Sequence, residues 1–304
     1  MSATSLKTLS LQAQAIVYML LAAVFASSMS VGIKMTGQNI PAGQIVWVRS
    51  AIAGIAMLPF LVPRGLAAFR SPRPALLLVR SVNATVIMLC GFYAVVHLPL
   101  VEVTALSFTK PFFLIVLAAL FLGEVVRLRR TVATVLGFIG VLVILRPTVS
   151  IEFAAVSALA AAFFMAVGTV LVKKLADDHT PELLIFYAAL GAVLLLAPTT
   201  LAGWVAPTPV EWIWLVLLGL LGTAAQACMI RAFYMAEATL IVPFEYTRIL
   251  FAAAFGYLLF AEVPDIWTWI GAAIIVGTTI YITHREARIG KKPSPIAEAT
   301  PKGI

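Results

Sequence analysis

The chain has 304 residues, of which 62% are hydrophobic and only 11% carry a charge, and its mean hydropathy is +1.06. A soluble domain could not cover this much apolar surface, because much of any folded surface stays exposed to water. The formal net charge of +8 does not indicate a nucleic-acid partner, since basic residues accumulate on the cytoplasmic loops of membrane proteins. The composition therefore predicts an integral membrane protein surrounded by a lipid bilayer.

Ten apolar stretches approach the roughly 20 residues that a helix needs to cross a bilayer. Helices fit these stretches better than barrel strands, which are about half as long and alternate in polarity. A helix also satisfies its backbone hydrogen bonds within the segment, as lipid requires. We predict an all-α integral membrane protein whose ten transmembrane helices cover residues 15–32, 43–61, 75–96, 101–122, 131–145, 153–172, 183–201, 213–230, 239–260 and 266–282.

The distribution of lysine and arginine predicts the orientation. With the N-terminus inside, the outer loops hold only Lys34 and Arg146. The bias predicts both termini in the cytoplasm of a multi-pass protein of the cell (inner) membrane. The first stretch is interpreted as an uncleaved helix, and the polar residues 284–304 as a disordered tail. The inner loops and tail hold Arg64, Arg70, Arg73, Arg127, Arg129, Arg130, Lys173, Lys174, Arg285, Arg288, Lys291 and Lys292.

Short matches between the two halves indicate an internal duplication. One offset relates Lys110 to Arg248, and the same offset relates Glu124 to Glu262 and Cys90 to Cys228. Five helices per copy would make the second copy enter the membrane from the opposite side. Such an inverted repeat is typical of secondary transporters, whose two halves can rock to open either face.

The repeated segments also resemble a known family. The runs TAL at 104–106, KP at 110–111 and LFLGE at 120–124, with VPFEY at 242–246 and GYLLFAE at 256–262, are similar to the EamA-type branch of the drug/metabolite transporter superfamily. Ala261 replaces the glycine usual before the second glutamate. The resemblance implies a first repeat at 15–147, a second at 151–283 and a central substrate cavity lined by the third and sixth helices. On that basis Tyr93 and Phe164 are candidate substrate contacts.

Charged side chains inside a bilayer cost about 2.5–3.5 kcal/mol each, so they are expected to face protein or water. Arg49, Lys110, Glu245 and Arg248 fall within predicted helices. We expect Lys110, Glu245 and Arg248 to bind substrate. Glu245 and Arg248 are three residues apart and would share a helix face, either as a neutralising pair or as a grip on a zwitterion. Lys110 is the repeat equivalent of Arg248, but Ser107 stands at the position equivalent to Glu245, so Lys110 has no acid of its own. This predicts an excess of positive charge in the central cavity and a carboxylate-bearing substrate.

The remaining intramembrane polar residues leave alternatives open. Arg80 and Arg231 lie near cytoplasmic helix ends, where their side chains can extend to the interface. Asn83 and Gln226 need partners inside the membrane and are either substrate ligands or interhelical hydrogen bonds. Four residues are interpreted as structural: Pro111 and Pro243, each of which removes a helical hydrogen bond, and Glu124 and Glu262 at helix ends.

The leading functional hypothesis is a secondary active transporter that exports amino acids or related zwitterionic or carboxylate compounds, with a proton as a candidate coupling ion. The alternative is uptake or exchange of a nucleoside-like metabolite such as S-adenosylmethionine. A remote alternative is a membrane-embedded enzyme using Asp177 and Asp178. No glycine-rich phosphate loop, nucleophile triad or metal-ligand spacing is present in the sequence, so we expect no cofactor and no metal.

Overall fold

The computed structural model describes residues 11–65, 69–122, 128–145, 152–175, 178–235 and 244–290, and every regular element within them is a helix. The α-helices are α2 Leu11–Thr36, α3 Ala42–Leu61, α4 Pro74–His97, α5 Leu100–Ser107, α6 Lys110–Leu122, α7 Leu128–Leu145, α8 Phe153–Leu175, α9 Pro181–Ala202, α10 Pro209–Met235, α12 Arg248–Phe260 and α13 Ile266–Gly290, and a single 3-10 turn, η1 Val62–Arg64, follows α3.

Six of these helices, α2, α3, α4, α8, α9 and α10, are long and apolar enough to cross a membrane by length and composition. α12 and parts of α7 and α13 are shorter apolar helices. The polar tail begins later than expected, because α13 continues past His284 to Gly290. The added turn consists mostly of helix-favouring residues and ends at a glycine.

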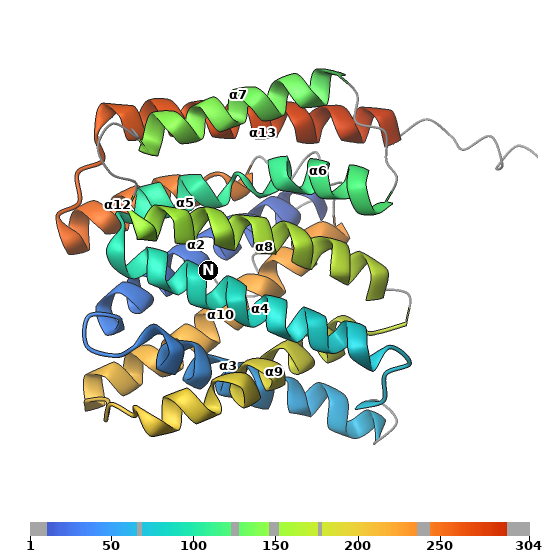
Figure 1. The fold of residues 1–304 in the computed structure, drawn as a ribbon, viewed down its shortest axis with the longest axis vertical. Coiled ribbons are helices and arrows are strands. Elements are labelled where there is room, and N and C mark those ends of the chain that lie inside the picture. The colour runs from blue at the N-terminus through green and yellow to red at the C-terminus, as the bar shows by residue number, and fades with distance from the viewer. Residues whose placement is uncertain are drawn as a thin grey trace, which may run out of the picture.

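The two halves of the chain pack against each other rather than forming separate lobes. α2 packs on α10, α4 on α8, α3 on α9 and α7 on α13. Figure 1 shows α7 and α13 side by side at one end of the long axis, with α3 and α9 at the other. The colours show that α3 and α9 run in opposite directions, as do α7 and α13. Antiparallel partners of this kind are what an inverted repeat produces.

The predicted fourth helix is interrupted and is not one continuous helix. α5 ends at Ser107 and α6 begins at Lys110, with a turn at Phe108 and Thr109 between them. Pro111 has no N–H to donate, so the helical bond that would reach Ser107 is missing. The Thr109 hydroxyl donates instead to the carbonyl of Leu106 at 2.6 Å. The hydrogen bond expected to be lost at Pro111 therefore coincides with a full break between α5 and α6.

The predicted ninth helix has the same interruption at the equivalent position. Tyr246 and Thr247 form a turn before α12, and the Thr247 hydroxyl donates to the Phe244 carbonyl at 2.7 Å. The rings of Phe108 and Tyr246, which are equivalent residues of the two halves, meet edge to face with their centroids 4.7 Å apart. The two breaks therefore lie beside each other. Pro243 and the upstream part of this segment lie outside the described residues.

Glycines allow α7 and α13 to pack closely. A Cβ atom at Gly271 would lie 2.6 Å from the backbone oxygen of Gly140 and 2.5 Å from a side-chain carbon of Ile144. A Cβ at Gly140 would lie 2.9 Å from Ile275. Small residues are favoured at membrane helix contacts because they let backbones approach. Gly277 lies on the same helix but has no atom within 4 Å of its Cβ position.

We expect Gly271→Ala to lower the stability of the protein by about 1–3 kcal/mol, because the added methyl overpacks the α7–α13 contact. Gly277→Ala is the matched control and should leave stability unchanged or raise it, since alanine is the better helix former. Thermal unfolding of the purified variants in detergent measures both. Equal unfolding temperatures for the two variants would contradict close packing at Gly271.

Candidate functional site

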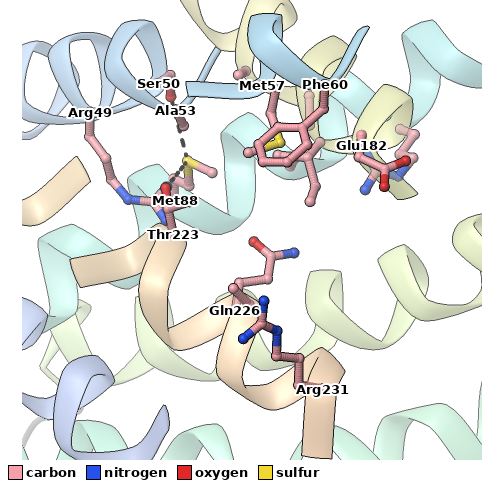
Figure 2. Close-up of a pocket in the computed structure, with 16 residues that line it drawn as sticks. Arg49, Ser50, Ala53, Met57, Phe60, Met88, Glu182, Thr223, Gln226 and Arg231 are labelled. Carbon is pink, nitrogen blue, oxygen red and sulfur yellow. Dashed lines mark hydrogen bonds between the residues drawn. The ribbon is translucent and has the colours of Figure 1, made fainter. Parts of the chain in front are cut away.

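The centre of the helix bundle contains two adjoining cavities. The larger one, of about 570 Å³, reaches the start of α6 at Lys110 and the start of α12 at Arg248. The smaller one, of about 490 Å³, lies between α3, α4, α9 and α10 and is shown in Figure 2. Both include Arg49, Arg80 and Gln226 in their walls. They are therefore treated as two parts of one central cavity.

The walls of this cavity are strongly basic. Among the described lining residues, the charged ones are Glu182 and five basic residues: Arg49, Arg80, Lys110, Arg231 and Arg248. In Figure 2, Gln226 and Arg231 project from α10, while Arg49 extends from α3. The structure thus brings together basic residues from five different helices. A cavity of this kind attracts anions, because its low-dielectric walls focus the field of its charges.

Arg49 extends across the bundle from α3. Its Nη1 donates to the sulfur of Met88 at 3.1 Å, and its guanidinium lies 5.8 Å from the centre of the Phe92 ring. Gly222 of α10 makes room for it, because a Cβ there would lie 2.8 Å from Arg49 Nη2. The buried Nε of Arg49 has no hydrogen-bond partner within the described protein. The arginine is therefore held by weak partners that leave donors available.

Arg80 lies in both parts of the cavity wall, which differs from the expected extension to the membrane interface. Its Nη1 donates to the backbone carbonyl of Leu184, while its buried Nε has no partner among the described groups. Asn83 follows three residues later on the same face of α4 and donates to the Phe164 carbonyl at 3.1 Å. The buried Oδ1 of Asn83 has no such partner. The three-residue spacing of Arg80 and Asn83 is a sequence signal that could have indicated this shared face.

Lys110 and Arg248 line the larger part of the cavity, and both experience the negative charge of Glu245. From the sequence, Glu245 was expected to pair with Arg248 alone. The turn at Tyr246 and Thr247 interrupts the helix between them, so the shared-face argument does not apply to this pair. No ion pair within 4.0 Å joins Glu245 to either base among the described residues. Glu245 partly offsets two cations, one from each half of the chain.

Two aromatic candidates, Tyr93 and Phe164, are not among the described residues that line the two parts of the cavity, so their role as substrate contacts stays a prediction. Tyr93 stacks on His97 with a centroid distance of 4.1 Å and contacts Phe153 edge to face. The Phe164 ring contacts Phe163, and only its backbone carbonyl reaches Asn83. On α4 the lining positions include 80, 83, 84, 87, 88, 91, 92 and 95, a helical stripe that does not include 93. The family resemblance indicated which helices line the cavity, but it did not show which face of α4 turns toward the cavity.

One end of the bundle is closed by contacts between the two halves. Glu262, which follows α12, forms an ion pair with Lys34 of α2. Its other oxygen accepts a hydrogen bond from the N–H of Leu100 at the start of α5, at 2.8 Å. Lys34 also donates to the Leu98 carbonyl at 2.8 Å and lies over the Phe260 ring. Glu262 thus contacts both α2 and the start of α5, while Glu124 lies outside the described residues.

At the opposite end the cavity reaches the surface of the bundle. Its wall there includes Arg231, which is exposed, and Phe60, which is 56% exposed. Nearby, Arg73 forms an ion pair with Asp178 at 3.0 Å, and Ser71 hydrogen-bonds to Nε2 of His179 at 2.6 Å. These contacts join the loop before α4 to the loop before α9. Asp178 is the described member of the Asp177–Asp178 pair considered for the enzyme alternative, and it is engaged in this ion pair.

The sequence matches a family model across both halves. The model of the EamA-like transporter family matches residues 13–146 and again residues 152–283. A solved structure with a TM-score of 0.62 covers 91% of this chain and 99% of its own, at 20% sequence identity. At that identity the likeness concerns the fold alone. The two family matches account for most of the described helices.

Three curated relatives are transporters of different solutes. The pseudopaline exporter of Pseudomonas aeruginosa is 33% identical over 269 residues, which cover 87% of this chain and 94% of the relative. The S-adenosylmethionine uptake transporter of Rickettsia felis is 29% identical, over 89% of this chain and 92% of its own. The riboflavin transporter of Brucella anthropi is 32% identical, over 83% and 91%. This chain therefore belongs to the EamA-like transporter family and is a multi-pass membrane protein with two EamA domains.

Proposed function

We propose that the protein is a secondary active transporter that exports amino acids or related carboxylate-bearing metabolites across the inner membrane. The observation that carries this proposal is the central cavity, whose walls hold five basic side chains and one acid among the described residues. Cations in the middle of a membrane bundle are costly and mark a solute pathway. Guanidinium groups suit carboxylates because they form paired hydrogen bonds.

The proposal includes ten membrane crossings with both termini in the cytoplasm. In this proposal α5 with α6 makes one crossing, the predicted ninth helix, which ends in α12, makes another, and the eight other long helices make one crossing each. The repeats run from 15 to 147 and from 151 to 283, each with five crossings. The basic loop residues support this orientation, and it places the open end of the cavity on the cytoplasmic side.

The transport cycle in this proposal is alternating access, in which the two repeats rock around the central cavity. The Lys34–Glu262 ion pair would hold the outer end closed in the conformation described above. The relatives favour different solutes, and S-adenosylmethionine uptake is the second candidate function because one of them has that activity. The basic cavity disfavours it, since S-adenosylmethionine carries a sulfonium cation.

In proteoliposomes, the purified protein should give saturable uptake and counterflow of a carboxylate-bearing amino acid or metabolite. Arg248→Gln and Lys110→Gln should each reduce the apparent affinity of uptake tenfold or more, because loss of a buried charge partner costs about 2–5 kcal/mol of binding free energy. Arg73→Gln, which changes a partly exposed surface pair, is the control. Flux that does not saturate would indicate a channel, and cleavage of the solute would indicate an enzyme.

Glu262→Gln should loosen the closed end, because it removes the ion pair with Lys34 and keeps a hydrogen-bond acceptor for Leu100. A single cysteine at Val95, in a variant without Cys90 and Cys228, reports the change. Its labelling by an impermeant maleimide in right-side-out vesicles should rise about tenfold, which corresponds to about 1.4 kcal/mol.

The matched control for this measurement is Glu211→Gln. Glu211 contacts Asn39 and Thr208 near the same end of the bundle but does not contact Lys34. Labelling at Val95 should stay unchanged in this control. If Glu262→Gln and Glu211→Gln label at the same rate, the ion pair does not keep this end closed.

Glu245 is the proposed site of proton coupling, because its charge acts on Lys110 and Arg248 at the break between the half-helices. Glu245→Gln should abolish uphill transport driven by a proton gradient while exchange of substrate across the membrane continues. Glu152→Gln, a change at an exposed acid at the start of α8, should leave both unchanged. Loss of exchange together with uphill transport would assign Glu245 to substrate binding instead.

A further inference from the structure

We infer that the substrate carries at least two carboxylate groups on one extended skeleton, and that these groups bind at two separate basic stations of the cavity. The inference rests on the proposed transport function. The deep station consists of Lys110 and Arg248, which line only the larger part of the cavity. The shared station consists of Arg49 and Arg80, which line both parts.

The shared station retains hydrogen-bond donors for an anion, although the acid Glu182 lines the same part of the cavity. The hydrogen bonds of Arg49 and Arg80 go to the Met88 sulfur and the Leu184 carbonyl, which carry no negative charge. The buried Nε atoms of both arginines have no partner among the described groups. Charges in a membrane interior need compensation, and bidentate hydrogen bonding to a carboxylate uses the donors that remain.

The deep station also retains positive charge. Lys110 and Arg248 share the charge of Glu245, so a single acid stands against two bases. The Nε of Arg248 is buried and without a partner among the described groups. One further carboxylate would complete the balance. The two stations come from different helices, α3 and α4 against α6 and α12, and only the shared station also lines the smaller part of the cavity, so we assign one carboxylate to each.

The size and lining of the cavity specify the rest of the substrate. A volume of about 570 Å³ lies in the range of about 300–1,000 Å³ that holds drug-sized ligands, and a simple amino acid would leave much of it empty. The wall that both stations share also includes the apolar side chains of Ile87 and Met88 and the small residues Ala84 and Gly91. The class that fits is a conjugate of amino acids with two or more carboxylates joined by a carbon skeleton.

The test uses three dipeptides of nearly equal shape: glutamyl-glutamate, glutamyl-glutamine and glutaminyl-glutamine, which have three, two and one carboxylates. Dissociation constants are measured with the purified full chain in detergent. Glutaminyl-glutamine, which can fill only one station, should bind at least tenfold more weakly than the other two dipeptides, because hydrogen bonds to charged groups contribute about 1.5–3 kcal/mol. Inorganic phosphate at the same concentration should compete weakly, since one anion cannot occupy both stations.

Variants then assign the stations. In Arg49→Gln and in Lys110→Gln, the difference between the three-carboxylate and one-carboxylate dipeptides should shrink about tenfold each. Arg73→Gln, whose guanidinium belongs to a surface pair outside the cavity walls, should keep the full difference. Arg49→Lys keeps the charge and removes the planar fork; if Arg49→Gln does not fold, Arg49→Lys should still show a smaller difference.

Equal binding of the three dipeptides, or no binding of any of them, would overturn the inference. If a neutral or cationic solute such as riboflavin or S-adenosylmethionine is transported instead, the inference fails while the transport function stands. If no solute in the uptake screen is carried, the proposed function itself fails. The two failures are therefore distinguishable.

Discussion

The cost of an uncompensated charge in a lipid bilayer governs the organisation of this protein. Arg49, Arg80, Lys110 and Arg248 cannot face lipid, so they converge on one central cavity. Only one described lining residue of that cavity is acidic, and the charge of Glu245 also acts on Lys110. A cavity allows the bundle to hold such charges, because water or a solute anion can compensate them there. The electrostatic requirement for stability and the capacity to bind an anion therefore have the same origin.

The interrupted helices place two of these charges at the centre. Lys110 and Arg248 are the first residues of half-helices that follow equivalent turns, and Phe108 meets Tyr246 where the turns touch. Irregular backbone is tolerated inside a membrane only where protein or a cavity covers it. Here Phe108 and Tyr246 of the two turns contact each other, and Ser107, Lys110 and Arg248 beside the turns line the cavity. Threonine hydroxyls bond to nearby backbone carbonyls in both turns.

Packing between the halves explains how the cavity can be closed at one end and open at the other. Nearly every helix has its main partner in the opposite half, as in the α2–α10 and α4–α8 pairs. The Lys34–Glu262 contact joins α2 to the segment after α12, within a densely packed region. The opposite end has its own cross-half contact in the Arg73–Asp178 pair, but there the cavity wall includes exposed side chains. Ion pairs between the two halves are therefore present at both ends of the bundle, although the cavity reaches the surface at only one of them.

The sequence by itself determined the helical class, the family and the approximate position of most helices, because apolar length and lipid chemistry leave few alternatives. It also identified Lys110, Arg248, Asn83 and Gln226, since polar residues in apolar runs are conspicuous. Only the tertiary structure showed that Arg80 faces the cavity, that Tyr93 is not among the described residues lining it, and that Glu245 acts on Lys110 from the other half. The break before Arg248 has no counterpart of Pro111, because Ile249 stands at the equivalent position. The rotational phase of a helix and the pairing of distant charges depend on contacts between segments far apart in the chain, which local sequence does not encode.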